Sequence, residues 1–209
     1  MVYLPPAFTE TREDILLAHI ERHDFGLLVT HGTAGLIASQ IPFLTEHRDG
    51  KLFLQAHIAR GNPQAADLDG AGEVLAIFAG AHAYISPSWY EAGPAVPTWN
   101  YAAVHVYGPA RRVDDPIWLR ELVRRLSERH EGREPAPWDM QALPEPYVQS
   151  MLNGIVGIEL AVSRLEGKFK LSQNRPAADR PRIIAALEKR ADADSHAVAK
   201  LMREREPAS

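Results

Sequence analysis

The Asp49-Gly50 pair constrains the fold more than any other feature, because it stands between two runs of strand-forming residues. An Asp-Gly pair in this position favours a two-residue β-hairpin turn, in which both residues take positive φ angles. Residues 52–58 form the strand after the turn, and residues 36–45 and 27–30 form the two strands before it. The sequence therefore predicts three antiparallel strands in a meander near the N-terminus.

Helices and further strands follow from the spacing of apolar residues. Helical spacing and capping signals predict helices over residues 12–23, 117–131, 147–153 and 179–205. Alternating or β-branched residues predict further strands over residues 74–78, 101–113 and 155–165, the last ended by Gly167. Many short strands with helices between and beside them favour an α+β fold, a mainly antiparallel barrel.

Composition excludes several classes of function. The formal net charge of −4 gives the chain no general attraction to nucleic acid. The absence of cysteine excludes disulfides, thiolate metal ligands and a cysteine nucleophile. No apolar run reaches the length of a membrane span and the N-terminus lacks a signal-peptide pattern, so we expect a cytoplasmic protein with no membrane partner.

A direct DNA-binding role has little support in the sequence. The arginines of the helix predicted over residues 117–131 alternate with glutamates, which is typical of a solvated helix face. No pair of short helices carries a basic recognition face. DNA is therefore an open partner that would need a local patch or another protein.

The stretch from residue 82 to residue 108 holds two of the four tryptophans and four of the six tyrosines, interleaved with polar groups. Flat rings beside many hydrogen-bonding groups suit a planar ligand with a polar rim. The same residue types are enriched where a barrel closes or where subunits meet. Both interpretations of this aromatic stretch remain open at the level of composition.

Two polar, cationic segments flank the aromatic stretch, and we name them the first elbow (residues 57–64) and the second elbow (residues 168–175). The first contains Arg60 and, at Pro63, the start of a short helix. Arginine can bind two phosphate oxygens, and helix amides add donors, although a surface arginine beside a helix cap is the plainer interpretation. The second elbow repeats this chemistry with Lys170 and Arg175. Two such elbows favour an anionic planar ligand.

Other chemistry finds little support. No GxGxxG or Walker motif is present, and the nine histidines show no HxH or HExxH spacing, so we expect no metal site. Ser86 and Ser88 lie outside a GxSxG motif, which gives no basis for acyl transfer.

Several long segments, in the same order along nearly the whole chain, resemble the PaiB family. They are YLPPAF (3–8), AHIARGNPQ (56–64), AHAYISPSWY (81–90), VPTWNYAAVHVYG (96–108), IVGIEL (155–160) and KLSQNR (170–175). The family is described as flavin mononucleotide (FMN)-binding negative transcriptional regulators, usually homodimers. The resemblance implies a split β-barrel like that of flavin reductases and pyridoxamine-phosphate oxidases, with flanking and C-terminal helices. It also implies an FMN-binding domain over residues 1–175 and a helical extension over residues 176–209.

The resemblance also implies positions for the FMN contacts. The strand and elbow with His57, Arg60, Asn62 and Gln64 would approach the phosphate, Arg60 most strongly. The isoalloxazine or ribityl edge would lie near Ser39 and Gln40, and the ring would be walled by Ser86, Ser88, Trp89, Tyr90, Trp99 and Asn100. The site would be closed, from the other subunit of a dimer, by Lys170, Gln173, Asn174 and Arg175.

Three functions stay open on the sequence. The resemblance implies a homodimeric repressor that depends on flavin or responds to redox state, acting directly or indirectly. The alternative is an FMN-dependent oxidoreductase acting on a small molecule or a nicotinamide, for which no catalytic residue can be named. A split-barrel interaction module that has lost its cofactor is the third.

Overall fold

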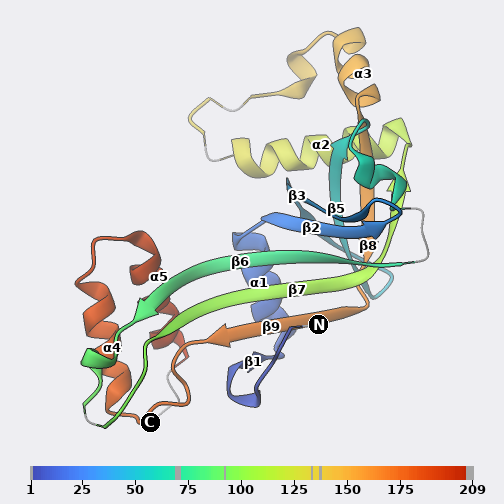
Figure 1. Cartoon of the computed structure of the whole chain (residues 1–209). Coiled ribbons are helices and arrows are strands. Elements are labelled where there is room, and N and C mark those ends of the chain that lie inside the picture. The colour runs from blue at the N-terminus through green and yellow to red at the C-terminus, as the bar shows by residue number, and fades with distance from the viewer. Residues whose placement is uncertain (1, 69–71, 92, 133, 137, 206–209) are drawn as a thin grey trace. The chain divides into compact units, whose positions relative to one another are not determined.

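The computed structural model describes residues 2–68, 72–91, 93–132, 134–136 and 138–205. The strands in these residues are β1 (Thr9–Glu10), β2 (Phe25–Gly32), β3 (Gly35–Pro42), β4 (Leu44–Arg48), β5 (Lys51–Ala59), β6 (Glu73–Ile85), β7 (Thr98–Val113), β8 (Ile155–Ala161) and β9 (Arg164–Lys170). The α-helices are α1 (Glu13–Arg22), α2 (Pro116–Glu131), α3 (Glu145–Asn153), α4 (Asp179–Glu188) and α5 (Ala193–Glu204) (Figure 1). Short 3₁₀ helices are η1 (Pro6–Phe8), η2 (Pro63–Ala66), η3 (Pro87–Trp89) and η4 (Met140–Ala142).

All strand pairings with a described register are antiparallel, and the hydrogen-bonded order is β3-β2-β6-β7-β8-β5-β4, with β9 pairing β7 and β1. The Asp49-Gly50 hairpin is confirmed: Arg48 pairs with Lys51, and the two turn residues have φ angles of 53° and 71°. Asp115 caps α2 as predicted, because its carboxylate accepts from the Ile117 amide at 2.8 Å.

The predicted meander is wrong at its middle strand. The run from residue 36 to residue 45 is broken at Phe43, which is 2% exposed and donates its backbone N–H to the Asp24 carbonyl at 2.8 Å. The run therefore divides into β3, which pairs with β2, and β4, which pairs with β5. Burial of one aromatic side chain separates two hairpins that the apolar alternation had joined.

The predicted last strand over residues 155–165 is also two strands. The chain breaks after Ala161, where the Val162 and Ser163 amides bond to the carbonyls of Leu52 and Tyr107 at 3.0 and 2.9 Å. Gly167 lies inside β9 opposite Glu10, so it does not end a strand. A Cβ atom at Gly167 would overlap the side chain of Leu16, which explains why glycine occupies this position.

The chain folds into two compact units, each assembled from separate stretches of the sequence. Unit 1 comprises Met1–His19, Ala79–Val104 and Glu166–Ser209, and unit 2 comprises Ile20–Phe78 and His105–Leu165. The chain passes between the units four times, and each passage falls inside an element: α1, β6, β7 and β9. The division into residues 1–175 and 176–209 stays a prediction.

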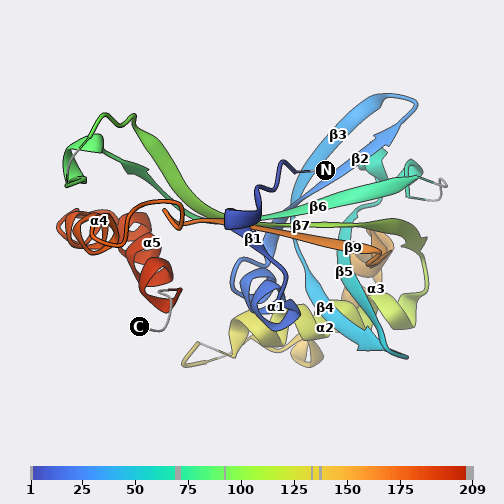
Figure 2. The ribbon, with the colours of Figure 1, turned by 90° about the horizontal axis from the view of Figure 1, so that it is seen from below.

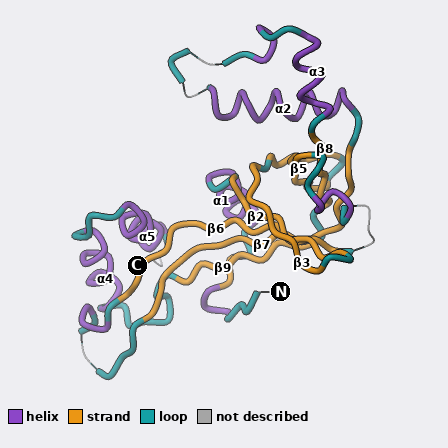
Figure 3. The backbone as a smooth tube through the Cα atoms, turned by 45° about the horizontal axis from the view of Figure 1, so that its top comes forward, coloured by secondary structure: helices purple, strands orange, loops and turns teal. Residues whose placement is uncertain are grey.

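Unit 2 is built around β5 and β8. Their register pairs Leu54 with Leu160 and Ala56 with Ile158, and all four side chains are fully buried. The helices α2 and α3 contact one another and pack against β8, as the purple tubes of Figure 3 show. A Cβ atom at Gly157 would overlap the ring of the α2 residue Trp118, so this glycine permits the helix to approach the strand.

Unit 1 contains β1, most of its antiparallel partner β9, parts of β6 and β7, and the two C-terminal helices. The predicted helical segment over residues 179–205 forms α4 and α5, which lie side by side (Figure 2). Arg180, 6% exposed, donates to the carbonyls of Leu171 and Met202 at 3.0 Å each. A buried guanidinium thus fixes the second elbow to both C-terminal helices.

Candidate functional site

The first elbow connects β5 to η2 within unit 2, and its amide side chains hold it against the β2–β3 hairpin. Asn62 caps η2 by accepting from the Gln64 amide at 3.0 Å, and its side chain donates to Ser39 Oγ at 3.1 Å. Gln64 is fully buried, and its Nε2 donates to Thr30 and to the carbonyls of Leu28 and Ile37. The side chains of these predicted site residues therefore bind the first elbow to strands β2 and β3.

The guanidinium of Arg60 hydrogen-bonds to groups of its own chain. Its Nε and Nη2 donate to the carbonyls of Asn153 and Ile155 at 2.8 and 2.9 Å, and its Nη1 bonds to Asp114 Oδ1 at 2.7 Å. The Arg60 amide also donates to the Gly154 carbonyl at 2.8 Å. These contacts join the end of β5 to the start of β8, and within the described residues they leave two of the five guanidinium N–H donors without an acceptor.

Other predicted residues of unit 2 point in different directions. Ser39 and Gln40 are adjacent on β3, so their side chains lie on opposite faces of the strand, and only Ser39 contacts the first elbow. His57 lies on β5 opposite Gly157, and burial lowers the pKa of its imidazole. His57 is therefore neutral at pH 7.

The two serines of the aromatic stretch hydrogen-bond to each other. Ser86 caps η3 by accepting from the Ser88 amide at 3.3 Å, and the two hydroxyl oxygens lie 2.8 Å apart. The adjoining Trp89 accepts from Arg182 at its backbone carbonyl at 3.1 Å. These contacts stabilise the turn between β6 and β7, and the two serine hydroxyls bond to each other within it.

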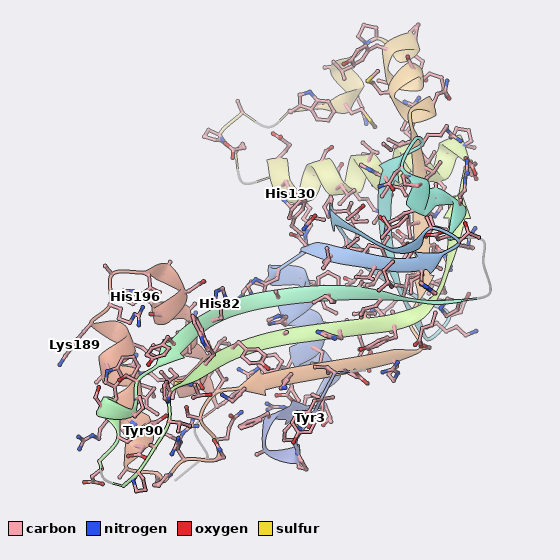
Figure 4. The ribbon with its side chains drawn as sticks, viewed as in Figure 1. Tyr3, His82, Tyr90, His130, Lys189 and His196 are labelled. Carbon is pink, nitrogen blue, oxygen red and sulfur yellow. The ribbon has the colours of Figure 1, made fainter. Side chains whose placement is uncertain are left out.

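Two ring clusters of unit 1 differ in exposure. Trp99 is 52% exposed, and its ring lies 6.0 Å from that of Tyr84 and 5.9 Å from that of His82. Tyr90 is buried beneath the guanidinium of Arg175, which lies 4.1 Å from the ring centroid. Figure 4 shows Tyr90 beside α4 and His82 on β6. Only the first cluster offers a ring surface to solvent.

The second elbow opens onto a pocket of about 130 Å³ that lies wholly in unit 1. The pocket gathers four of the predicted site residues and four further residues, and it is lined by Val96, Pro97, Thr98, Asn100, Lys170, Ser172, Asn174 and Arg175. The lining contains two cations, two hydroxyls and two amides, and no carboxylate. We call it the cationic pocket.

Buried hydrogen bonds fix the shape of the cationic pocket. Asn100 is fully buried and exchanges hydrogen bonds with Ser172 at 2.9 and 3.2 Å. Ser172 has a φ angle of 62°, a left-handed conformation that is uncommon for serine. Gln173 points away from the pocket, donating to the Phe169 carbonyl and accepting from the Leu171 amide. Gln173 therefore supports the elbow without lining the pocket.

Within the described part of the chain, no carboxylate balances the charges of the cationic pocket. Lys170 Nζ donates to the Trp99 carbonyl at 2.6 Å and to the hydroxyl of Thr98, both neutral acceptors. Burial, with Lys168 and Arg175 nearby, lowers the pKa of the Lys170 ammonium. Among the described residues, neither Lys170 nor Arg175 forms an ion pair with a carboxylate. This donor set fits a phosphate group, while its volume is too small for a whole flavin.

Thr98 belongs to the aromatic stretch but was not assigned to the site, although its position two residues before Asn100 on one strand face was a usable signal. Sequence reasoning also missed Glu159, a carboxylate 3% exposed on β8. Burial acts to raise the Glu159 pKa, but hydrogen bonds from Arg48, Arg111 and Gln55 outweigh it, so the pKa is lowered. Glu159 joins neighbouring strands through ion pairs.

The described part of the chain holds no group of three or more His, Asp or Glu side chains placed to bind a metal ion. No helix in it is long and apolar enough to cross a membrane.

Comparison with known proteins places these features in a family. Residues 2–164 match the family described as "Putative FMN-binding domain". The chain is 34% identical over 205 residues to "Protease synthase and sporulation protein PAI 2" of Bacillus subtilis (strain 168), covering 98% of each. It is 32% identical over 244 residues to an uncharacterized protein of Emericella nidulans, AN0679, covering 98% of this chain and 97% of the other.

Solved structures with the same fold include the flavocytochrome Anf3 from Azotobacter vinelandii, with a TM-score of 0.58 and 10% identity over 80% of this chain and 72% of the other. An FAD and heme binding protein from Mycobacterium smegmatis gives a TM-score of 0.57 and 14% identity, over 85% of this chain and 79% of the other. The predicted fold class, a mainly antiparallel α+β split barrel with flanking helices, is confirmed.

Proposed function

The chain belongs to the PaiB family of FMN-binding proteins and has FMN as its cofactor, and from this premise we propose that it is a homodimeric repressor whose activity depends on the bound flavin. The observation that carries the proposal is the similarity to PAI 2 of Bacillus subtilis along 98% of both chains, which includes both elbows and the aromatic stretch. The name of that relative refers to protease synthase and sporulation and to no substrate, which favours regulation over catalysis.

The surface of α2 supports an indirect mode of repression. Each of its arginines is paired with carboxylates, in the pairs Arg120–Glu145, Arg124–Glu121, Arg124–Glu128, Arg125–Glu46 and Arg129–Asp24. A helix whose cations are already neutralised offers little to DNA phosphates, and the formal net charge of −4 adds a general repulsion. We therefore expect repression to act through another protein or through a change in the dimer.

Unit 1 has exposed apolar residues that could pack against a second copy of the chain in a dimer. Tyr3, Val96 and Trp99 are 80%, 71% and 52% exposed, and aromatic residues are enriched where subunits meet. In this proposal the redox state of FMN shifts the population of the repressing dimer, because a ligand shifts an equilibrium by its different affinity for the two states.

The first experiment is the visible absorption spectrum of the purified protein, followed by mass identification of the released chromophore. Stoichiometric FMN supports the cofactor in this chain. A colourless protein that takes up no added FMN would overturn the proposal and leave an interaction module.

Sedimentation of the oxidised and the dithionite-reduced protein then tests the dimer, and transcript levels in cells with and without the chain test repression. A change in the monomer–dimer equilibrium on reduction, together with raised transcripts in the absence of the chain, is expected. Rapid turnover of a reduced nicotinamide with unchanged transcripts would favour the oxidoreductase instead.

A further inference from the structure

The second elbow places two cations in the cationic pocket without a carboxylate beside them. Two of the three N–H donors of the Lys170 ammonium reach neutral oxygens, those of Thr98 and Trp99. The Arg175 guanidinium lies over the Tyr90 ring and makes no hydrogen bond within the described residues. Like charges that line one pocket repel each other, so an anion bound between them gains from both.

Two neutral side chains of the pocket offer further donors to an anion. The Thr98 hydroxyl accepts from Lys170, so its own hydrogen can be donated to a ligand. The Asn174 amide is exposed at the pocket and makes no hydrogen bond within the described residues. Together with Lys170 and Arg175, donors from four side chains line one cavity of about 130 Å³.

The backbone that carries the two cations is held in a strained conformation. Ser172, between them, has a φ angle of 62°, in the left-handed region that serine seldom adopts. Hydrogen bonds from buried Asn100 hold it there. Residues in sparsely populated backbone conformations cluster at binding sites, where the surrounding structure enforces them. The second elbow therefore has the features of a built site, with a fixed frame and donors left open.

A phosphate group matches this set of donors. As a monoester it presents three acceptor oxygens and a charge of about −1.5 to −2 near pH 7, which two cations balance. Arginine binds two phosphate oxygens at once, and lysine acts as a compact charge on another. The apolar side chains of Val96 and Pro97 line the same pocket, where a small organic part of an ester would pack.

The two cations lie outside the part of the chain that matches the FMN-binding family. That match ends at residue 164, and Lys170 and Arg175 follow it. We propose that the cationic pocket is a second anion site of this protein, which binds the phosphate group of a small ligand other than the flavin. This inference goes beyond the proposed function, because it requires neither repression nor a particular position of FMN.

The test titrates the FMN-loaded protein with inorganic phosphate and follows the ³¹P resonance of the added phosphate. Binding is expected while FMN stays on the protein, which the visible absorption of an ultrafiltrate checks. Lys170→Met and Arg175→Met should each weaken phosphate binding roughly 10-fold or more, the range expected for hydrogen bonds to charged groups. The double variant should show no binding.

The matched control is a double variant, Arg182→Met with Lys189→Met. It removes the same two charges from exposed positions in α4 and directly after it, also in unit 1. This control should bind phosphate as wild type does, and Lys170→Arg, which keeps the charge, should retain most of the binding. Circular dichroism should show that all variants are folded. Equal weakening in the control would assign the binding to net charge and overturn the inference.

A second arm compares inorganic phosphate with phenyl phosphate and separates two sources of the phosphate group. Tighter binding of the ester indicates a phosphorylated small molecule that packs against Val96 and Pro97, and otherwise the free ion is the ligand. Both results support the site. Absence of phosphate binding, or binding by flavin-free protein that FMN abolishes, would overturn the inference. None of these results depends on repression, so the proposed function is tested separately.

Discussion

The two elbows contain the same kinds of side chain and use them in opposite ways. In the first elbow, three of the five N–H donors of the Arg60 guanidinium bond to Asp114 and two backbone carbonyls of its own chain. In the second, within the described residues, Lys170 donates to neutral oxygens and lies over the Phe8 ring, and Arg175 lies over the Tyr90 ring. A cation is available to a ligand only where the folded chain leaves some of its donors without acceptors. The residue type alone does not show whether this is so.

The largest expected effect is a loss of folding stability when the arginine of the first elbow is replaced. Arg60→Met removes charged donors from the carbonyls of Asn153 and Ile155, and we expect a loss of about 2–3 kcal/mol in the free energy of unfolding. Urea denaturation measures it. Asp114→Asn, which keeps the carbonyl contacts, should cost about 1 kcal/mol or less. If Arg60→Met instead left the free energy of unfolding unchanged, the comparison would fail.

The second effect concerns the frame of the cationic pocket. Asn100→Ala removes the buried hydrogen bonds to Ser172, which should lower the free energy of unfolding by about 1–2 kcal/mol and weaken phosphate binding. Thermal unfolding and the ³¹P titration check the two outcomes. Asn174→Ala, an exposed position on the same pocket, should leave unfolding unchanged. Equal stability of both variants would show that the pocket is not held by Asn100.

A third, smaller effect is the dependence of phosphate affinity on pH. Burial, Lys168 and Arg175 lower the pKa of Lys170, so the ammonium loses its proton at a lower pH than an exposed lysine does. The affinity for phenyl phosphate should therefore fall by a few fold as the pH rises from about 8 to 10, where the phosphate charge no longer changes. Lys170→Arg should remove most of this dependence, because arginine stays protonated. A steep fall that persists in Lys170→Arg would assign it to another group.

The smallest effect belongs to the first elbow and affects stability alone. Burial lowers the pKa of His57, so the unfolded chain binds this proton more readily than the folded chain. The folded chain bears no cost for this above the unfolded pKa of about 6.5, and it loses stability as the pH falls from there towards the lower pKa of the folded chain. Between pH 7.5 and 5.5, His57→Gln should lose less stability than wild type, by about 1 kcal/mol or less. Identical pH profiles would show that the pKa of His57 is the same in the folded and the unfolded chain.

Local signals predicted much of the fold. Asp49-Gly50 and Asp115-Pro116 define their turn and helix start through contacts within a few residues, so both predictions were confirmed. The meander failed because the break at Phe43 depends on burial of its ring, and apolar alternation does not show which side chain will be buried. The 155–165 strand failed for a similar reason, since the break depends on the Leu52 and Tyr107 carbonyls.

Part of the candidate site could be predicted because some of its residues are neighbours in the sequence. Lys170, Asn174 and Arg175 gather at one pocket because they are neighbours in one turn, and the segment KLSQNR already shows them together. The function of Arg60 could not be inferred, because its acceptors lie 54, 93 and 95 residues away in the chain. Single-sequence reasoning found the polar groups, but their partners come from the tertiary structure.

Each passage of the chain between the two units falls within α1, β6, β7 or β9. A cut at any of these passages would divide a helix or a strand, and no one segment of the sequence encodes a whole unit. A single crossover between relatives therefore cannot exchange one whole unit, because unit 1 is built from three stretches of the sequence and unit 2 from two.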